Sequence, residues 1–454
     1  MKTFKYNIIS LSLLALSTQA CATASNTPNV AKVNATLETR SHFSNDMEFF
    51  TDVDDPAIWI HPTDKSRSVV ITALKKGGLD TYSLDGNLLQ HIVAAPAPGC
   101  ENNRKCENKA GRINNVDLIY NFNLNGKLID IAVASDRGLD TLVIYAIEEN
   151  SDGNIVLKDI TAADVPRIFT STQEEVNEGL TAYGLATAKT DKYMAFVTQN
   201  STTTVAQLEL FVDTQGKVNY RSMVDIVFPS AFSLPNGQFW TPCSDDDGKL
   251  PHFEGMVADP ENNTLFLAQE DVGIWKTSLS APNDVRTWSL FSKVKKYGVP
   301  YTRVWDQAEE EYACTLDFNK APGYGDPYLN ADAEGLTMYD SGNGKGYILA
   351  SSQGDNTVAL YQRDGDNQYV SSFTVTDGSS VDAVNETDGM MVVNVNLGGK
   401  FDQGLLVMQD GKNATSREHL DGAKGDNSNF KYVSWGDIAS KLNLPVNTKD
   451  LTRK

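Results

Sequence analysis

Hydrophobic and polar positions follow one pattern that recurs six times along the chain. In each copy an apolar strand ends in polar residues, turns, and leads into a second strand that ends in another turn. The copies are Val69–Lys76 with Thr81–Asp85, Ile129–Arg137 with Thr141–Glu148, Met194–Asn200 with Ala206–Thr214, Leu265–Asp271 with Gly273–Ser278, Ile348–Asp355 with Thr357–Asp364, and Met391–Asn396 with Gly404–Asp410. Successive copies begin roughly 45 to 85 residues apart, which is typical of one four-stranded blade per copy. The pattern predicts an all-β fold, a six-bladed β-propeller with four-stranded antiparallel blades.

The two ends of this pattern predict how the ring closes. The last copy is short, and a candidate strand lies near the start of the chain at Val33–Arg40. An N-terminal strand that completes the final blade would close the ring and protect its edges. Helical periodicity is scarce, and Trp435–Leu442 is the best candidate for a short helix. Two segments rich in loop formers, Ala95–Ile113 and Pro282–Asp332, are typical of inserts at a propeller rim.

The start of the chain predicts export. Residues 1–24 have the order of a signal peptide, with two early lysines, a short apolar core and small-residue cleavage sites. Cys21 follows an imperfect lipoprotein cleavage box, so a lipid anchor through Cys21 and plain cleavage remain alternatives. No later stretch reaches about 18 apolar residues, so we expect no transmembrane segment. The expected division is a flexible leader at 25–36 and a single propeller domain at 37–454, in a periplasmic or secreted protein.

Cysteine content and net charge narrow the environment and the partners. Four cysteines lie outside the signal region, and in an exported chain they predict two disulfides. Cys100–Cys106 would close a polar loop, and Cys243–Cys314 would join two inserts. The net charge of −20 argues against nucleic acid or anionic membranes as partners and is compatible with calcium, which takes hard oxygen ligands. Simple solubility is the alternative explanation of this charge.

Charged side chains recur where the predicted strands end. The acids are Asp54, Asp55, Glu254, Glu270, Asp332, Glu334, Asp382 and Asp388. Each alone is typical of a solvated turn, but their recurrence in different blades favours calcium, which takes about six to eight oxygen ligands. Three cations, Lys75, Lys76 and Arg137, end the first strands of two copies. Arginine offers phosphate a planar fork and lysine a point charge, although basic residues at turns are commonly just surface.

Longer stretches around these residues follow one order through nearly the whole mature chain. They are Asp54–Trp59, Lys75-Lys76, Asn114–Asp117, Ala134–Arg137, Tyr183-Gly184, Glu254–Met256, Glu270-Asp271, Ile274–Lys276, Asp332–Thr337, Ser351–Gly354, Asp382, Thr387–Gly389, Gln409–Gly411 and Asn429–Lys431 with Trp435. In sequence and order they resemble the beta-propeller phytases, a calcium-dependent alkaline family of the 3-phytase type. The resemblance implies a six-bladed propeller with several calcium ions, Ca²⁺, at its wide mouth.

The resemblance also implies a role for individual residues. The catalytic calcium cluster would be surrounded by Asp54, Tyr183, Glu254, Glu270, Glu334 and Asp388. Substrate phosphates would be bound by Lys75, Lys76 and Arg137. Further calcium ions would be held by Asp55 with the carbonyls of Pro56 and Val116, by Asp332 and Gln353 in the central channel, and by Asp382.

The activity implied by the resemblance is the hydrolysis of phosphomonoesters of phytate, myo-inositol hexakisphosphate. Water bound to calcium would attack phosphorus in line and give inorganic phosphate and lower inositol phosphates. The partner is therefore a small molecule, bound as its calcium complex. We expect a monomer, because a closed propeller needs no second copy to cover its edges.

One element of the family pattern is missing. The family has a phosphate-binding lysine after the strand of the third blade, where this chain has Thr198–Ser201. Our hypothesis is that Lys295, Lys296 or Arg303 supplies the missing cation. These residues form the nearest basic cluster in an insert that would reach the mouth.

Other functions compete with phytate hydrolysis at this stage. Cys106–Arg112 has the bare Cys-x5-Arg spacing of cysteine phosphatases, but it lacks the preceding histidine and the glycines of a phosphate-binding loop. A calcium-dependent propeller hydrolase of the lactonase type would also use acids at the mouth, but it would not need Lys75, Lys76 and Arg137 together. A non-catalytic propeller that binds a partner stays open as well, because a fold alone does not fix a function.

Overall fold

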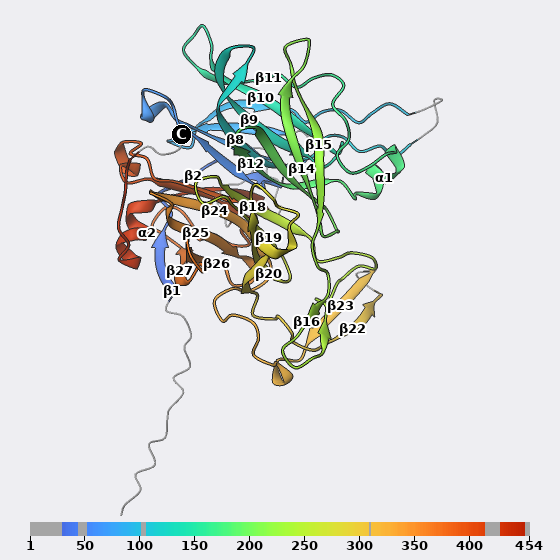
Figure 1. Ribbon diagram of the computed structural model, residues 1–454. Coiled ribbons are helices and arrows are strands. Elements are labelled where there is room, and N and C mark those ends of the chain that lie inside the picture. The colour runs from blue at the N-terminus through green and yellow to red at the C-terminus, as the bar shows by residue number, and fades with distance from the viewer. Residues whose placement is uncertain (1–29, 44–51, 101–105, 308–309, 414–426, 450–454) are drawn as a thin grey trace, which may run out of the picture.

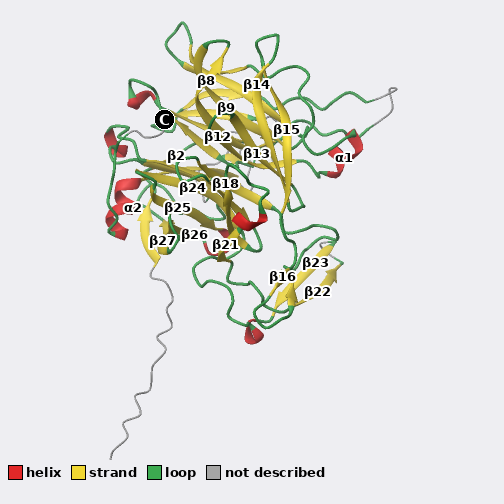
Figure 2. Ribbon diagram, viewed as in Figure 1, coloured by secondary structure: helices red, strands yellow, loops and turns green. Residues whose placement is uncertain are grey.

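The computed structural model describes residues 30–43, 52–100, 106–307, 310–413 and 427–449. In these ranges strands dominate and helices are short (Figures 1 and 2). Most strands form small antiparallel sheets in chain order, and the sheets of four or more strands are the blades. The signal peptide, Cys21 and residues 25–29 lie outside the described residues, so these predictions stay as they are.

Six blades make up the propeller, as the sequence pattern predicts. Blades one to three are β4 (Pro56–Trp59), β5 (Val69–Ala73), β6 (Leu79–Ser83) and β7 (Leu88–Ile92); β8 (Ile113–Leu124), β9 (Lys127–Asp136), β10 (Thr141–Glu149) and β11 (Ile155–Asp159); and β12 (Ala182–Lys189), β13 (Tyr193–Gln199), β14 (Thr204–Val212) and β15 (Val218–Val227). Blades four and five are β18 (Phe253–Asp259), β19 (Thr264–Gln269), β20 (Gly273–Ser278) and β21 (Ser289–Lys293); and β24 (Ala333–Gly342), β25 (Lys345–Ser352), β26 (Thr357–Gln362) and β27 (Tyr369–Thr376).

The first strand of every blade lies innermost. Strands β4, β8, β12, β18, β24 and β28 (Met390–Val393) contact one another in this order, and β28 contacts β4, so they form a closed ring around a central channel. The second strands are packed from both faces, and every residue of β5 is buried. A strand that is covered on both faces has a continuous run of apolar residues. The second strands are therefore the easiest to recognise in the sequence.

The sixth blade uses both ends of the chain. It contains β28, β29 (Leu405–Asp410), β30 (Asn427–Ser434) and β2 (Leu37–Glu38), and β3 (His42–Phe43) also pairs with β30. The prediction that an N-terminal strand closes the ring is confirmed. The sequence pattern was wrong in register here, because Met391–Asn396 overlaps the first strand of the blade, whereas the other five copies begin in the second strand.

The predicted leader at 25–36 also needs correction. Residues Val30–Asn34 form β1, which pairs in parallel with β27 at the edge of blade five. Val33 is buried against Phe373 and Val375, and this burial fixes the strand. The described part of the predicted leader is therefore largely a strand.

The range predicted for the second insert, Pro282–Asp332, includes β21 of blade four. The insert itself therefore begins only after β21. The rest forms the hairpin of β22 (Tyr301–Asp306) and β23 (Glu311–Leu316), which lies near β16 (Phe232–Ser233) and β17 (Phe239–Trp240) in a small lobe at the lower right of Figure 1. Both predicted disulfides are present, Cys100–Cys106 and Cys243–Cys314, and the second ties the hairpin to the segment before β18.

The described chain has two α-helices. The predicted helix α2 (Trp435–Leu442) is confirmed, with Trp435, Ile438 and Ala439 buried. Helix α1 (Gln173–Glu178) was missed, although Thr172 and Glu175 form a capping box that is readable in the sequence. Within the residues that the structure describes, no helix has the length and apolar character needed to cross a membrane.

Candidate active site

One position recurs at the start of the innermost strand of all six blades. In β8, β12, β18 and β24 the pairing with the second strand shifts register there, between Ile113 and Val116, Ala182 and Leu185, Phe253 and Met256, and Ala333 and Leu336. A bulge of this kind re-aims a side chain. In β4 and β28 the same position falls just before the strand. Its occupants, which we call the inner ring, are Asp54, Asn114, Tyr183, Glu254, Glu334 and Asp388.

Glycines let neighbouring blades approach each other closely at the inner ring. A Cβ added to Gly184 would lie 1.9 Å from the carbonyl oxygen of Glu254, and one added to Gly255 would lie 2.1 Å from that of Glu334. Both distances are far shorter than any real contact. The glycines after the next two members approach the following blade in the same way; they are Gly335 and Gly389. The glycines that follow Tyr183 and three of the acids therefore set the width of the ring.

Three buried carboxylates converge in the inner ring and beside it. Glu254, Glu270 and Glu334 each offer an oxygen atom, and these atoms all lie within 4.8 Å of one another. The Tyr183 hydroxyl donates to Glu254 Oε2 at 2.7 Å, and Asn114 Nδ2 donates to Glu254 Oε1 at 2.7 Å. The geometry places a hard oxygen-lined site at one end of the channel.

The electrostatics of the cluster show how poorly its charge is compensated. Burial raises the pKa of Glu334 well above its ordinary value, and the charges of Glu270 and Glu254 raise it further. Burial also raises the pKa of Asp54, which the Lys75 ammonium offsets only in part. Burial acts on Glu254 in the same direction, but the hydrogen bond with Glu334, the charge of Lys75 and the bond from Tyr183 outweigh it and lower its pKa.

Two cations and an amide surround the acids at the mouth. The Lys75 Nζ atom lies 2.7 Å from Asp52, 3.4 Å from Asp54 and 3.3 Å from Asp388. Gln353 Nε2 donates to Asp388 Oδ1 at 2.9 Å. The guanidinium of Arg137 lies over the Tyr183 ring, 4.7 Å from its centre. Lys76 follows Lys75 in the turn and is exposed.

The third blade has no cation at the corresponding position. Arg137, Glu270 and Gln353 directly follow the second strands of their blades, and Asn200 does so in blade three. The Asn200 side chain donates to the carbonyl oxygen of Gly179 at 2.9 Å. The amide therefore fixes a loop there.

Of the three residues suggested as substitutes, only Lys296 is shown beside the carboxylates of the site. Its ammonium lies 2.5 Å from Asp271 and 3.9 Å from Asp332. Arg303 instead pairs with Asp247 at 2.8 Å in the small lobe, and Lys295 is exposed. Lys296 is already paired with acids and adds no uncompensated positive charge.

The residues expected to hold further calcium ions differ in their surroundings. Asp55 is brought to Val116, whose backbone N–H donates to Asp55 Oδ2 at 3.2 Å, and Pro56 begins β4 beside it. Asp332 and Gln353 are also adjacent, since the Gln353 N–H donates to the Asp332 carbonyl oxygen at 3.0 Å. Burial, followed by the charges of Asp271 and Glu270, raises the pKa of Asp332 to about 7.

Asp382 lies in a different cluster, which already contains a cation. The fully buried Lys431 ammonium contacts Asp382, lies 2.5 Å from Glu38 and 3.3 Å from Asp410, and donates to Asn413 Oδ1 at 2.7 Å. An ammonium group occupies the place among these oxygens where a metal ion would sit. A calcium ion at Asp382 would have to displace this ammonium.

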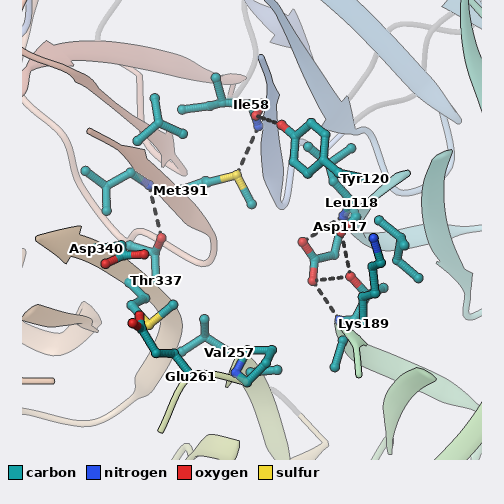
Figure 3. Close-up of a pocket in the computed structure, with 18 of the residues that line it drawn as sticks. Ile58, Asp117, Leu118, Tyr120, Lys189, Val257, Glu261, Thr337, Asp340 and Met391 are labelled. Atoms are coloured by element: carbon teal, nitrogen blue, oxygen red, sulfur yellow. Dashed lines mark hydrogen bonds between the residues drawn. The ribbon is translucent and has the colours of Figure 1, made fainter. Parts of the chain in front are cut away.

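The channel also contains a cavity of about 540 Å³, which Figure 3 shows. Its lining residues lie on the same inner strands, but farther along each strand than the inner-ring residues. They include Ile58, Leu118, Val257 and Met391. Asp117 in its wall accepts hydrogen bonds from Thr187 N at 2.7 Å and Thr187 Oγ1 at 2.9 Å. The wall is mostly apolar, and its cations Lys189 and Arg363 lie among the acids Asp117, Glu261 and Asp340.

Sequence reasoning missed four residues of the site. Asn114 was part of a recognised stretch but was given no role. His252 Nε2 lies 2.9 Å from Glu270 Oε1, and Asp52 pairs with Lys75, but neither had a motif of its own. Arg112 was noticed only as the end of a discarded motif. The recurrence of the inner-ring position could have found Asn114, whereas the other contacts depend on how distant segments meet.

The acids of the inner ring fit a divalent calcium ion. Among the described residues, Asp54 Oδ1 and Glu334 Oε2 are buried and accept no hydrogen bond. Buried carboxylate oxygens without a partner are costly unless a cation neutralises them. Carboxylates and a tyrosine oxygen are the hard donors that calcium prefers.

Comparison with known proteins places these features in a family. The sequence model described as phytase matches residues 2–231 and 308–453. The 3-phytase of Bacillus subtilis (strain 168) is 35% identical over 416 residues, which cover 90% of this chain and 85% of the relative. A solved protein of unknown function from Bacteroides thetaiotaomicron VPI-5482 has a TM-score of 0.43 at 10% identity, with 89% of this chain and 74% of that chain covered. A luciferin-regenerating enzyme has a TM-score of 0.39 at 7% identity, with 87% and 96% covered, and neither structure is close enough to bear on function.

Proposed function

The chain belongs to the phytase family and hydrolyses phytate, and we propose that calcium ions held by the inner ring take part in this reaction. The observation that carries the proposal is the convergence of Glu254, Glu270 and Glu334 within 4.8 Å at a buried site. A cluster so rich in uncompensated carboxylates calls for a divalent cation.

The proposed ligands of the catalytic calcium ions come from every blade except the second. They are Asp54, Tyr183, Glu254, Glu270, Glu334 and Asp388. Calcium, when bound, neutralises phosphoryl oxygens and lowers the pKa of water. We also propose calcium at Asp55 with the carbonyls of Pro56 and Val116, and at Asp332 with Gln353. We do not extend the proposal to Asp382, because its carboxylate is already paired with the Lys431 ammonium.

The chain's own residues orient the ligands and the substrate. Tyr183 and Asn114 hold the two oxygens of Glu254 with hydrogen bonds of 2.7 Å. His252 holds Glu270, and burial would lower the pKa of this imidazole, but the neighbouring Glu270 charge outweighs burial and raises it.

Substrate phosphates are assigned to the cations of the mouth. We propose that Arg137, which lies over the Tyr183 ring, presents its guanidinium fork to phosphoryl oxygens, and that Lys75 and Lys76 add point charges on the blade-one side. Water attacks phosphorus in line, the bond from phosphorus to the inositol oxygen breaks, and that oxygen takes up a proton. The products are inorganic phosphate and a lower inositol phosphate.

Export and a monomeric state complete the proposal. The two disulfides support an oxidising compartment, which is periplasmic or extracellular. The closed ring of inner strands supports a monomer, because it leaves no inner edge to be covered by a second copy.

The test is phosphate release from phytate near neutral pH, first with calcium and then with excess EDTA. We expect EDTA to abolish release and added calcium to restore it. Glu254→Gln should lower kcat roughly a hundredfold or more, because it removes a charge from the centre of the cluster. Arg137→Ala should lower kcat/KM by about tenfold or more. Glu148→Gln, on an exposed carboxylate of β10, is the matched control. Full activity in metal-free protein would contradict the calcium proposal.

A further inference from the structure

Arg112 lies at the mouth of the propeller, directly before β8. Its backbone N–H donates to Asp136 Oδ1 at 2.8 Å, and its carbonyl oxygen accepts from the Arg137 N–H at 2.8 Å. A Cβ added to Gly138 would lie 2.0 Å from the carbonyl oxygen of Ala110, so the two segments are packed backbone to backbone. This packing fixes Arg112 beside Arg137.

The guanidinium of Arg112 is held in the site without a counter-ion of its own. Its Nε atom is buried and makes no hydrogen bond within the described ranges, and no ion pair to it is present there. Burial lowers the pKa of Arg112, and the positive charge of Arg137 lowers it further, while Asp54, Asp52 and Tyr183 act in the opposite direction. The Arg112 guanidinium is thus within electrostatic range of Arg137 and of the inner-ring residues Asp54 and Tyr183.

Arg363, a buried arginine far from the inner ring, shows which partners a structural arginine has in this protein. Arg363 is 2% exposed and pairs with Asp259 at 2.5 Å, Asp340 at 2.7 Å and Glu261 at 3.2 Å. Arg112 has no comparable set of partners among the described residues. Two adjacent guanidinium groups repel each other, and an unpaired buried donor is unfavourable, so folding alone does not account for this arrangement.

A phosphate group would resolve both costs. It carries negative charge and several acceptor oxygens, and guanidinium forks bind it with charge-assisted hydrogen bonds. We propose that Arg112 is a substrate-binding residue that, together with Arg137, binds a phosphate group of phytate. The pair supplies the positive charge that blade three lacks at Asn200. This assignment rests on phytate hydrolysis at the inner ring, and it concerns binding rather than the attack on phosphorus.

The first test is kinetic. Arg112→Met keeps much of the side chain's volume but removes its charge, and Arg112→Lys keeps the charge but loses the fork. We expect Arg112→Met to raise the KM for phytate about tenfold, with kcat changed by less than about threefold, and Arg112→Lys to fall between it and the unsubstituted protein. Arg221→Met, on an exposed arginine of β15 that pairs with Glu209, is the control and should leave both constants unchanged. A KM for phytate within twofold of that of the unsubstituted protein in Arg112→Met would overturn the proposal.

A second test does not depend on catalysis. Inositol hexasulfate is a polyanion that cannot release phosphate, and calorimetry measures its binding to each variant in the presence of calcium. We expect about tenfold weaker binding by Arg112→Met. The melting temperature of this variant without ligand should be equal or higher, because an uncompensated charge beside Arg137 is gone. A lower melting temperature with unchanged binding would assign Arg112 a structural role and reject the proposal.

The outcomes separate this inference from the calcium proposal. If Glu254→Gln abolishes turnover and Arg112→Met binds hexasulfate normally, only the role of Arg112 fails. If metal-free protein is fully active, the calcium proposal fails, and the binding measurement on Arg112 still decides its own question.

Discussion

Asp388 shows at the residue scale why the site needs a cation. Burial raises the pKa of this carboxyl to about 7, even though the Lys75 ammonium at 3.3 Å lowers it. Asp332 reaches a similar value through burial and the nearby acids Asp271 and Glu270. In the absence of metal, these two groups compensate for missing positive charge by keeping their protons.

This protonation predicts how stability depends on pH in the metal-free protein. In the unfolded chain the same carboxyls lose their protons at about pH 4, whereas in the fold they keep them to about pH 7. The folded state therefore binds more protons across this window, and the free energy of unfolding contributed by these groups falls as pH rises through it. Above about pH 7 the contribution is flat.

The measurement is urea unfolding in EDTA from about pH 5 to 7.5, for the unsubstituted protein and for Asp388→Asn. The stability of Asp388→Asn relative to the unsubstituted protein should increase as pH rises, because the amide has no proton to lose. Saturating calcium should remove this trend. A relative stability that decreases over the same window would contradict the assignment.

At the scale of single elements, the bulge and its glycine are the device that builds the inner ring. In β12, β18 and β24 the bulge turns one side chain out of the regular alternation, and the following glycine lets the next blade come close. The acids thus owe their convergence to the backbone. A change that leaves every acid in place can still separate them.

Gly255→Ala tests this device. The added Cβ would lie 2.1 Å from the carbonyl oxygen of Glu334, so β18 and β24 must move apart. We expect a loss of about 2 kcal/mol or more in the free energy of unfolding, and a fall of at least tenfold in kcat for phytate. Gly99→Ala, where no atom lies within 4 Å of the added Cβ, is the matched control and should change neither quantity measurably. Unchanged kinetics in Gly255→Ala would show that the ring tolerates displacement.

The strands that the sequence revealed are those whose local pattern is strong. The second strands are buried on both faces, and their apolar runs placed five of the six copies correctly. The sixth was displaced because residues 411–426 separate β29 from β30, so β28 and β29 were taken for the equivalent pair. Strand β21 was read as a loop, because only one of its five residues, Ser292, is buried.

The site was predictable where its residues lie in recurring stretches and not where it depends on packing. Glu254 and Glu334 each stand before a glycine, and this pairing is visible in the chain. The contact of His252 with Glu270, and that of Lys75 with Asp388, join segments whose distance is set by the closed ring. The contact of Asp382 with Lys431, which comes from β30, was hidden for the same reason, and calcium at Asp382 stays a prediction.

For the whole molecule, Lys431 joins the two ends of the chain. It lies on β30 and is fully buried among Glu38 of β2, Asp382 and Asp410. Closure of the ring thus includes a buried ion cluster as well as strand pairing. Removing one member of such a cluster leaves uncompensated charge in the interior.

Lys431→Met should therefore destabilise the ring by about 3 kcal/mol or more, because three carboxylates lose their cation. The melting temperature should fall by a similar amount with calcium and with EDTA, since the cluster of the unsubstituted protein needs no metal. Lys412→Met, on an exposed lysine that pairs with Glu386, is the control and should cost about 1 kcal/mol or less. A deficit that is confined to the metal-free protein would show that calcium does bind beside Asp382.

The sixth blade also sets the order of events when the chain is made. Strand β2 is synthesised early and waits for β30, which comes near the end of the described chain. Asp54 and Asp388 belong to the two sides of the same late seam, so the inner ring stays open until almost the whole chain is available. A chain that is interrupted before Asp388 cannot complete the inner ring. The complete inner ring therefore forms only in molecules whose synthesis has reached the sixth blade.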